Sequence, residues 1–199
     1  MTTKTRRNSP RGGPLGLAKR RRVSIWAWVG FAVPLVVVLV VMIVGALAGE
    51  PESAIEAERA PGFTLPTSTG GTVSLDEILA QGDALLYFSM GVGCDGCFTQ
   101  IPEASAGLAE RGLQLVPVMV DRPEMVSQEA ARFGITMPVL IDETREVSEA
   151  YGMLGVYGHG DRPSHSFALV RADGTVAWVQ HYATMFVPLD QLLADMGEA

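Results

Sequence analysis

The chain has 199 residues, of which 48% are hydrophobic, and its formal net charge at pH 7 is −7. Eight of the 15 Lys and Arg residues lie in residues 1–22, which hold none of the 22 acidic residues, so the rest of the chain is strongly anionic. Nucleic-acid binding needs Lys and Arg side chains that contact phosphates. The anionic body therefore argues against nucleic acid as a partner.

Residues 23–49 contain no charged side chain and are long enough to cross a bilayer as one helix. Trp26 and Trp28 lie near the basic end of this segment, where indole rings favour the membrane interface. The KRRR cluster at residues 19–22 favours a cytoplasmic N-terminus, which places the C-terminal body outside the cytoplasm. A cleaved signal peptide is the alternative, because the ALA sequence at residues 46–48 has the form of a cleavage site. We expect a retained single-pass anchor in the cell membrane, since the apolar segment is longer than a usual signal core.

The sequence divides into a basic cytoplasmic tail (1–22), a transmembrane helix (23–49), a charged linker (50–60) and a folded domain (61–199). In the folded domain, apolar runs that suit buried strands alternate with helical patterns. In chain order, the predicted elements are a hairpin around residues 70–71, a strand at 84–89, a helix at 94–110, a strand at 113–121, a helix at 123–133, an extended segment at 137–142, a helix at 144–151, a hairpin turning at 173–174 and a helix at 188–196. This order predicts an α/β domain in which helices flank a central mixed sheet and the last strands are antiparallel.

The two cysteines of the chain, Cys94 and Cys97, lie three residues apart at the predicted start of the helix that follows strand 84–89. The N-terminus of a helix carries partial positive charge, which stabilises a thiolate. The pair therefore suits thiol–disulfide exchange. Cys94, as the more exposed thiolate, would attack a substrate disulfide, and the more buried Cys97 would then displace the product.

Two other uses of a cysteine pair are weaker. A zinc site usually needs four ligands, but the chain has no second pair, and its three histidines, at positions 159, 165 and 181, are not spaced like ligands. A purely structural disulfide that closes so short a loop would restrict the unfolded chain little. We therefore expect a redox pair without a cofactor or a bound metal.

The order of the strand ALLYFS, the CDGC motif and a helix resembles the thioredoxin fold, and more closely the redoxin branch that includes peroxiredoxins and membrane-anchored, TlpA/ResA-like thiol–disulfide oxidoreductases. The likeness covers about residues 60–196. It includes the opening APGFTLPTSTGGTVSLDEIL, Pro102 at the position of a helix-kinking proline, and the closing SFALVRADGTVAW. The resemblance implies a thioredoxin-like fold with an N-terminal β-hairpin. It also implies an enzyme that uses Cys94 and Cys97 to exchange disulfides with protein or small-molecule thiols, and that receives electrons from a membrane or extracytoplasmic donor.

The CDGC motif departs from the thioredoxin pattern, in which Trp precedes the first Cys and Pro often precedes the second. Gly93 and Gly96 occupy these two positions. Asp95 places a negative charge between the sulfur atoms, which disfavours a thiolate. We therefore expect a less oxidising couple than the strongest periplasmic oxidants.

A peroxiredoxin-like reading is the main alternative. Peroxiredoxins show a pattern of the form F-x-P-x-x-x-T-x-x-C, and counting from Phe88 places its last residue on Cys97. Met90 and Cys94 then stand at the Pro and Thr positions. In this reading Cys97 is the peroxidatic cysteine and Cys94 the resolving cysteine. Copper delivery and a non-enzymatic exported binding module are further alternatives.

The DRPSHSF sequence supplies the other candidate site residues. The resemblance implies a cis-proline opposite the CxxC motif, for which Pro163 is the candidate, and it implies that Pro163, Ser164 and His165 bind substrate. His165 as an imidazolium would lower a thiol pKa or pass protons. Arg162 is a candidate for binding a substrate carboxylate. Gln100 stands where ResA-like relatives carry a Glu that assists proton transfer, which leaves the proton acceptor unidentified.

Overall fold

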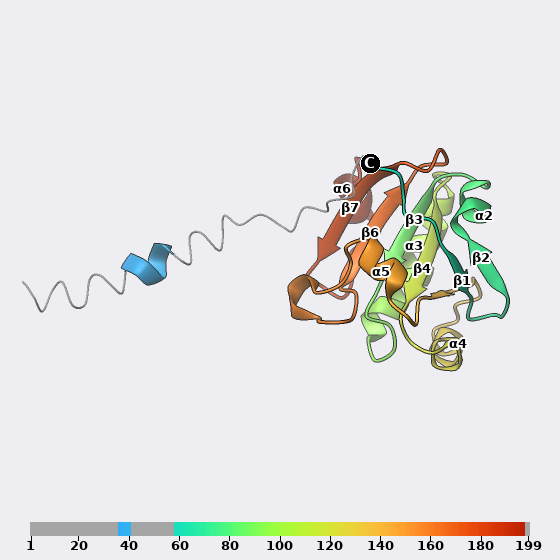
Figure 1. Cartoon of the computed structure of the whole chain (residues 1–199), viewed down its shortest axis with the longest axis horizontal. Coiled ribbons are helices and arrows are strands. Elements are labelled where there is room, and N and C mark those ends of the chain that lie inside the picture. Colours follow the sequence, from blue (N-terminus) through green and yellow to red (C-terminus); the bar gives the residue numbers. More distant parts are fainter. Residues whose placement is uncertain (1–35, 41–57, 198–199) are drawn as a thin grey trace, which may run out of the picture. The chain divides into compact units, whose positions relative to one another are not determined.

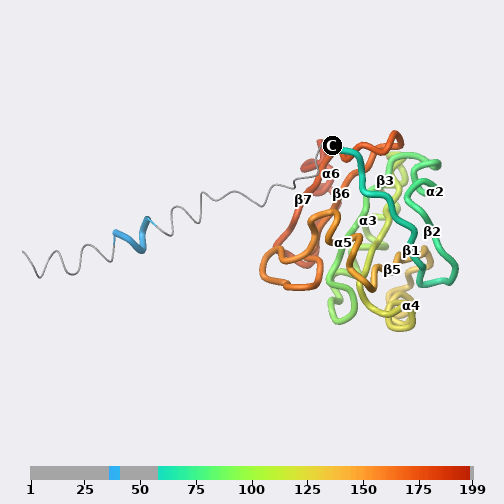
Figure 2. Tube along the Cα trace, viewed as in Figure 1, coloured from blue at the N-terminus to red at the C-terminus, as the bar shows by residue number. Residues whose placement is uncertain are grey.

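The computed structural model describes residues 36–40 and 58–197, shown in Figures 1 and 2. The chain divides into two units, Met1–Ala48 and Gly49–Ala199. In the first unit, residues 36–40 form a helical segment. The remainder of the predicted anchor, the basic tail and most of the linker lie outside the described residues. Among the residues that are described, no helix is both long and apolar enough to cross a membrane.

A five-stranded sheet in the order β5-β4-β3-β6-β7 forms the centre of the second unit (Figure 1). Its strands are β3 (Ala84–Phe88), β4 (Gln114–Met119), β5 (Leu140–Ile141), β6 (His165–Val170) and β7 (Val176–Tyr182). Strands β3, β4 and β5 are parallel, whereas β6 runs antiparallel to both β3 and β7. Every residue of β3 is buried, as its continuous apolar sequence predicts for a central strand covered on both faces. The mixed sheet with antiparallel last strands confirms the predicted fold class.

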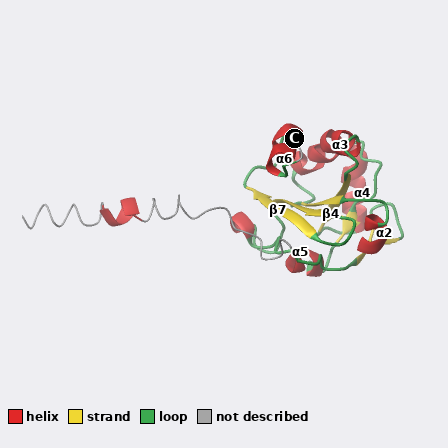
Figure 3. Ribbon diagram, turned by 90° about the horizontal axis from the view of Figure 1, so that it is seen from above, coloured by secondary structure: helices red, strands yellow, loops and turns green. Residues whose placement is uncertain are grey.

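Helices cover both faces of this sheet, as Figure 3 shows. Helices α3 and α6 lie on one face, and α2 and α5 lie on the other. The helices are α2 (Leu75–Leu79), α3 (Asp95–Ala109), α4 (Pro123–Arg132), α5 (Glu146–Ala150) and α6 (Leu189–Asp195), with a 3₁₀ turn at Val156–Gly158. Because strand side chains alternate, Leu85 and Tyr87 of β3 pack in the core under α3, and Leu86 and Phe88 pack in the core on the opposite face.

The predicted N-terminal hairpin is present as β1 (Thr64–Pro66) and β2 (Thr72–Ser74), which form a separate two-stranded sheet. Helix α2 begins directly after β2 and is not among the elements predicted from the sequence. A capping box starts this helix: the Glu77 N–H donates to the Ser74 hydroxyl at 3.3 Å, and the Ser74 N–H donates to the Glu77 carboxylate at 2.8 Å. The S-x-x-E spacing that marks this start is visible in the sequence.

Candidate active site

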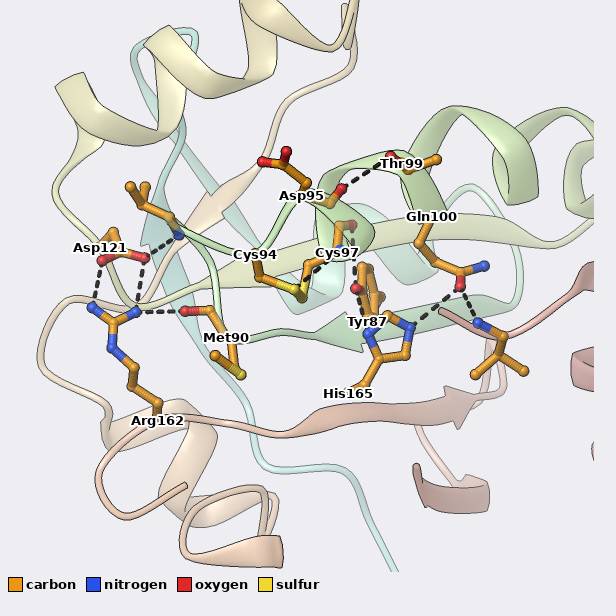
Figure 4. The surroundings of a disulfide bond; sticks show 12 residues. Tyr87, Met90, Cys94, Asp95, Cys97, Thr99, Gln100, Asp121, Arg162 and His165 are labelled. Atoms are coloured by element: carbon orange, nitrogen blue, oxygen red, sulfur yellow. Dashed lines mark hydrogen bonds and ion pairs between the residues drawn. A yellow bond between two sulfur atoms is a disulfide. The ribbon is translucent and has the colours of Figure 1, made fainter. Parts of the chain in front are cut away.

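Cys94 and Cys97 form a disulfide at the N-terminus of α3 (Figure 4). Cys94 is the N-cap residue, and its sulfur atom accepts a hydrogen bond from the Cys97 N–H at 3.2 Å. In the reduced protein, the backbone N–H groups of the first turn of α3 and the helix dipole favour a thiolate at Cys94. Cys94 is 6% exposed and Cys97 is 0% exposed. The prediction that Cys94 is more exposed than Cys97 is therefore confirmed, although Cys94 is itself almost completely buried.

The loop between β3 and α3 is held in place by Asp121, which follows β4. The Asp121 carboxylate accepts a hydrogen bond from the Val92 N–H at 2.8 Å and pairs with Arg162 through a 2.7 Å contact. Arg162 also donates to the Met90 carbonyl, as Figure 4 shows. At Gly91, where φ is +77°, an added Cβ would lie 2.1 Å from an Asp121 carboxylate oxygen. The loop can therefore pass this close to Asp121 only because residue 91 is glycine.

Arg162 is a candidate for binding a substrate carboxylate, but in the structure its guanidinium is paired with Asp121. The hydrogen bonds that Arg162 donates to Asp121 raise the pKa of Arg162 above its ordinary value, and Asp121 itself is buried. Asp121 is not among the site residues predicted from the sequence. The sequence feature that points to it is an acidic residue at the carboxyl end of the buried run LQLVPVMVD. The carboxyl ends of neighbouring parallel strands lie at the same edge of a sheet, which is where ligand sites form.

The two residues between the cysteines have different surroundings. An added Cβ at Gly96 would lie 2.7 Å from the backbone oxygen of Met185, because the segment after β7 packs against the first turn of α3. Asp95 is exposed and forms an ion pair with Arg132 of α4. The hydrogen bond that Arg132 donates to the Asp95 carboxylate is the largest cause of the raised pKa of Arg132. A positive charge therefore accompanies the negative charge that was expected to disfavour a thiolate.

A buried polar network lies on the Cys97 side of the disulfide (Figure 4). The His165 ring contacts the Tyr87 hydroxyl through Nδ1 at 2.9 Å and the Gln100 Oε1 atom through Nε2 at 3.2 Å. Gln100 Oε1 also accepts the Val187 N–H at 2.7 Å, and the Tyr87 hydroxyl lies 3.2 Å from the Cys97 carbonyl oxygen. Tyr87 is not among the site residues predicted from the sequence, because this network joins residues of three separate elements.

Burial controls the charge of this network. It lowers the pKa of His165 to about 3 and raises the pKa of Tyr87 well above its ordinary value, so both side chains are neutral near pH 7. A neutral His165 does not fit the suggestion that its imidazolium lowers a thiol pKa, and its role in passing protons stays a prediction. The ring is neutral because it is fully enclosed and no charged partner hydrogen-bonds to it.

The segment before β6 differs from the pattern that the resemblance implied. No cis peptide bond occurs in residues 58–197, so the bond before Pro163 is trans, and Pro163 instead forms a β-bridge with Leu154. The buried Ser164 hydroxyl bonds to the Ser166 hydroxyl at 2.7 Å. Neither Pro163 nor Ser164 makes a hydrogen bond to a cysteine side chain, and their role in substrate binding stays a prediction.

The fold and the dithiol at the start of α3 define a redoxin with a thioredoxin-like domain. The model of the AhpC/TSA family matches residues 57–179, and the chain therefore belongs to this family. Among its relatives is a provisionally named peroxiredoxin of Mycobacterium tuberculosis, which is 33% identical over 101 residues that cover 49% of this chain. The chain spans only 64% of that relative's length.

Other relatives carry a different activity in their names. The thiol–disulfide oxidoreductase ResA of Bacillus subtilis is 26% identical over 139 residues, which cover 68% of this chain and 75% of ResA. Among solved structures, the peroxidoxin BcpB of M. tuberculosis matches with a TM-score of 0.62 and 21% identity, over 71% of this chain and 96% of BcpB. This structural likeness confirms the thioredoxin-like fold. The family thus includes both thiol–disulfide oxidoreductases and peroxidases.

Proposed function

We propose that this protein is a thiol–disulfide oxidoreductase that uses Cys94 and Cys97 to exchange disulfides with other proteins or small thiols. The observation that supports this most directly is the geometry of the pair: the two sulfur atoms bond to each other, and the outer one caps α3. In the reduced protein, the Cys94 thiolate attacks a substrate disulfide and forms a mixed disulfide. Cys97 then attacks the Cys94 sulfur and releases the substrate as a thiol.

A thiol peroxidase is the second candidate, because a relative is provisionally named a peroxiredoxin and the cysteine spacing fits the peroxiredoxin pattern. The site favours it less. In that reading Cys97 attacks the peroxide, but Cys97 is fully buried. Cys94 also takes the place of the Thr in the pattern, and Met90 the place of the Pro, so two groups that orient a peroxide are absent.

The decisive experiment compares two substrates with the purified full-length protein in its reduced state. We expect rapid reaction with a protein disulfide and slow reaction with hydrogen peroxide, both followed as loss of free thiols. The Cys97→Ser variant should stay covalently attached to its substrate through Cys94, and mass spectrometry identifies the attached species. Faster reaction with peroxide than with the disulfide, lost in Cys97→Ser and retained in Cys94→Ser, would instead establish the peroxidase.

We further propose that residues 23–49 anchor the protein in the cell membrane and that the redoxin domain lies outside the cytoplasm, with a membrane or extracytoplasmic electron donor. The support is the charge-free segment that follows the basic KRRR cluster. A membrane-impermeant maleimide added to intact cells should label Cys94 after mild reduction. Labelling that appears only after the cells are lysed would contradict the proposed topology.

A further inference from the structure

The two cysteines of the disulfide are held in place by different parts of the chain. Cys97 lies inside α3, and its side chain is fully buried. Cys94 lies at the end of the loop formed by residues 89–93, in which Gly91 and Gly93 have φ angles of +77° and +97°. Glycine loses more conformational freedom on ordering than any other residue. The position of Cys94 relative to Cys97 therefore depends on the contacts that hold this loop.

Two side chains from outside the loop hold it, as Figure 4 shows. The Asp121 carboxylate, which follows β4, accepts the Val92 N–H at 2.8 Å. The Arg162 guanidinium, which precedes β6, donates to the Met90 carbonyl oxygen. The same guanidinium donates to both carboxylate oxygens of Asp121, at 2.7 and 3.1 Å. We call Asp121 and Arg162 together the clamp, because they join the loop to the end of β4 and to the segment before β6.

The pairing within the clamp is bidentate and partly enclosed. The Asp121 side chain is 6% exposed and the Arg162 side chain is 34% exposed. A guanidinium that donates to both oxygens of a carboxylate is fixed in orientation as well as in position. Removing Arg162 would therefore do more than remove a surface charge, because the Met90 carbonyl would lose its donor and Asp121 would lose its partner.

The clamp is present in both redox states, but it restricts them unequally. None of its contacts involves a sulfur atom, so reduction of the disulfide breaks none of them. In the oxidised protein, the S–S bond also holds the Cα atoms of Cys94 and Cys97 5.3 Å apart. In the reduced protein that bond is absent, and the clamp remains to hold the loop. Keeping two reacting groups close together lowers the entropy lost when they bond, so the clamp favours closure of the disulfide.

We propose that Arg162 is a positioning residue that, through Asp121 and the Met90 carbonyl, sets how readily the Cys94–Cys97 disulfide closes. This inference rests on the proposed function, in which Cys97 resolves a mixed disulfide at Cys94. In that step the Cys97 thiol loses its proton to solvent and the thiolate attacks the Cys94 sulfur. An S–S bond forms between the two cysteines, and the bond from Cys94 to the substrate sulfur breaks. The substrate sulfur leaves with the electron pair as a thiolate, so the two cysteines are oxidised and the substrate is reduced.

Equilibration of the full-length protein with reduced and oxidised glutathione measures closure separately from the first step. Acid stops the exchange, and mass spectrometry then counts the dithiol, the mixed disulfide and the internal disulfide. The Cys97→Ser background cannot close, so it gives the equilibrium constant for forming the mixed disulfide at Cys94. The overall constant, measured with both cysteines present, divided by this first constant is the closure constant.

We compare the wild type with Arg162→Gln and Asp121→Asn, which remove opposite charges near the loop. A positioning role predicts that the closure constant falls in both variants. For Arg162→Gln we expect a fall of about tenfold, the effect of losing one hydrogen bond to a charged group. With the first constant unchanged, this fall raises the reduction potential by about 30 mV. A role for charge alone would instead move the closure constant in opposite directions in the two variants.

Arg171→Gln is the matched control, because it breaks another Arg–Asp pair at the opposite end of β3 and β6. Arg171 contacts Asp83 at 2.9 Å, and its side chain is 39% exposed, close to the value for Arg162. This variant should leave the closure constant unchanged. Arg162→Lys keeps the positive charge but lacks the planar fork, so its closure constant should lie between those of the wild type and Arg162→Gln.

Three results would overturn the inference: a closure constant that is unchanged in Arg162→Gln, one that moves in opposite directions in Arg162→Gln and Asp121→Asn, or one that falls equally in Arg171→Gln. A wild type that forms neither the mixed nor the internal disulfide at any glutathione ratio would instead reject the proposed function. Melting temperatures show which variants are folded. If Arg162→Gln is not, Arg162→Lys and Asp121→Asn decide the outcome.

Discussion

At the scale of single residues, the loop before the disulfide depends on a contact that only glycine permits. Gly91 combines a left-handed backbone with a position directly against the Asp121 carboxylate. Asp121 in turn holds Val92 and Arg162, so that a change at residue 91 displaces a carboxylate with three hydrogen bonds. The position of the Cys94 sulfur atom therefore depends on a residue whose sequence context, MGVG, gives no hint of its partner.

We predict that Gly91→Ala lowers the free energy of unfolding by two separate costs. The left-handed backbone costs about 1–2 kcal/mol in a residue with a Cβ. Displacing the Asp121 carboxylate removes the acceptor of the partly buried Val92 and Arg162 donors, which costs about a further 1 kcal/mol. Urea denaturation measures the sum. Gly93→Ala is the matched control, because Gly93 has φ of +97° but no atom within 4 Å of an added Cβ. Equal losses in the two variants would show that the Asp121 contact contributes nothing.

The buried His165 predicts a pH dependence of stability. Its pKa is about 3 in the folded protein and about 6.5 in the unfolded chain, so the unfolded chain binds the proton more tightly between these values. The stability that the neutral ring contributes is fully present above pH 6.5 and is lost as the pH falls toward 3. The slope is at most about 1.4 kcal/mol per pH unit.

Comparison with His165→Gln isolates this effect from the titration of carboxylates. The difference in unfolding free energy between the wild type and the variant should shrink steadily from pH 6.5 to pH 4. A difference that stays constant with pH would mean that His165 titrates equally in both states, and the ring would then not be enclosed as described.

At the scale of elements, α3 and α4 together set the charge around Cys94. The N-terminus of α3 favours the thiolate, Asp95 opposes it, and Arg132 of α4 offsets Asp95 through their ion pair. Because Arg132 offsets the charge of Asp95, the effect of Asp95 on the Cys94 thiolate is smaller than the sequence alone suggests. The pair is exposed, so solvent screens it and its influence is modest.

We predict that Arg132→Gln raises the pKa of the Cys94 thiol slightly in the reduced protein, because Asp95 then acts without its partner. The rate of alkylation by iodoacetamide, measured against pH, reports this pKa. Arg111→Gln is the control, since it removes the same charge at the opposite end of α3. If both substitutions change the pKa equally, the effect comes from net charge and the Asp95–Arg132 contact is irrelevant.

Much of the architecture follows from local sequence patterns. Three features are each determined by a short stretch of sequence: the continuous apolar run of β3, the Cys pair at a helix start and the Asp-Gly turn of the last hairpin. The cysteine pair of the candidate site was predicted for the same reason. The Asp121–Arg162 pair joins residues 41 apart, and the Tyr87–His165 contact joins residues 78 apart. Such contacts depend on the order of strands in the sheet, which no local pattern specifies, and the neutral charge of His165 depends on the burial that results.

At the scale of the whole molecule, the fold does not need the disulfide to hold it together. The Cys94–Cys97 bond closes a loop with a sequence separation of 3, so it removes little freedom from the unfolded chain. The domain is instead built on two apolar clusters, one on each face of the sheet. A bond that contributes little to stability can open and close while the domain stays folded, as an exchange reaction requires.

We predict that replacing both cysteines with serine keeps the domain folded and changes the free energy of unfolding by about 2 kcal/mol or less, the value expected for so short a loop. Thermal unfolding of the oxidised wild type and of the double variant measures this difference, and exchange activity should be abolished. A much larger loss of stability would return the disulfide to a structural role. Retained biological function in the double variant would favour a binding module.

The close approach of Gly96 to Met185 restricts how this active site can vary. Any side chain at residue 96 would collide with the backbone after β7, whereas the side chain at residue 95 projects into solvent. A library randomised at both positions and selected for folded protein should return most amino acids at residue 95 and almost exclusively glycine at residue 96. Of the two residues between the cysteines, only residue 95 can therefore vary freely when a new reduction potential is sought by laboratory evolution.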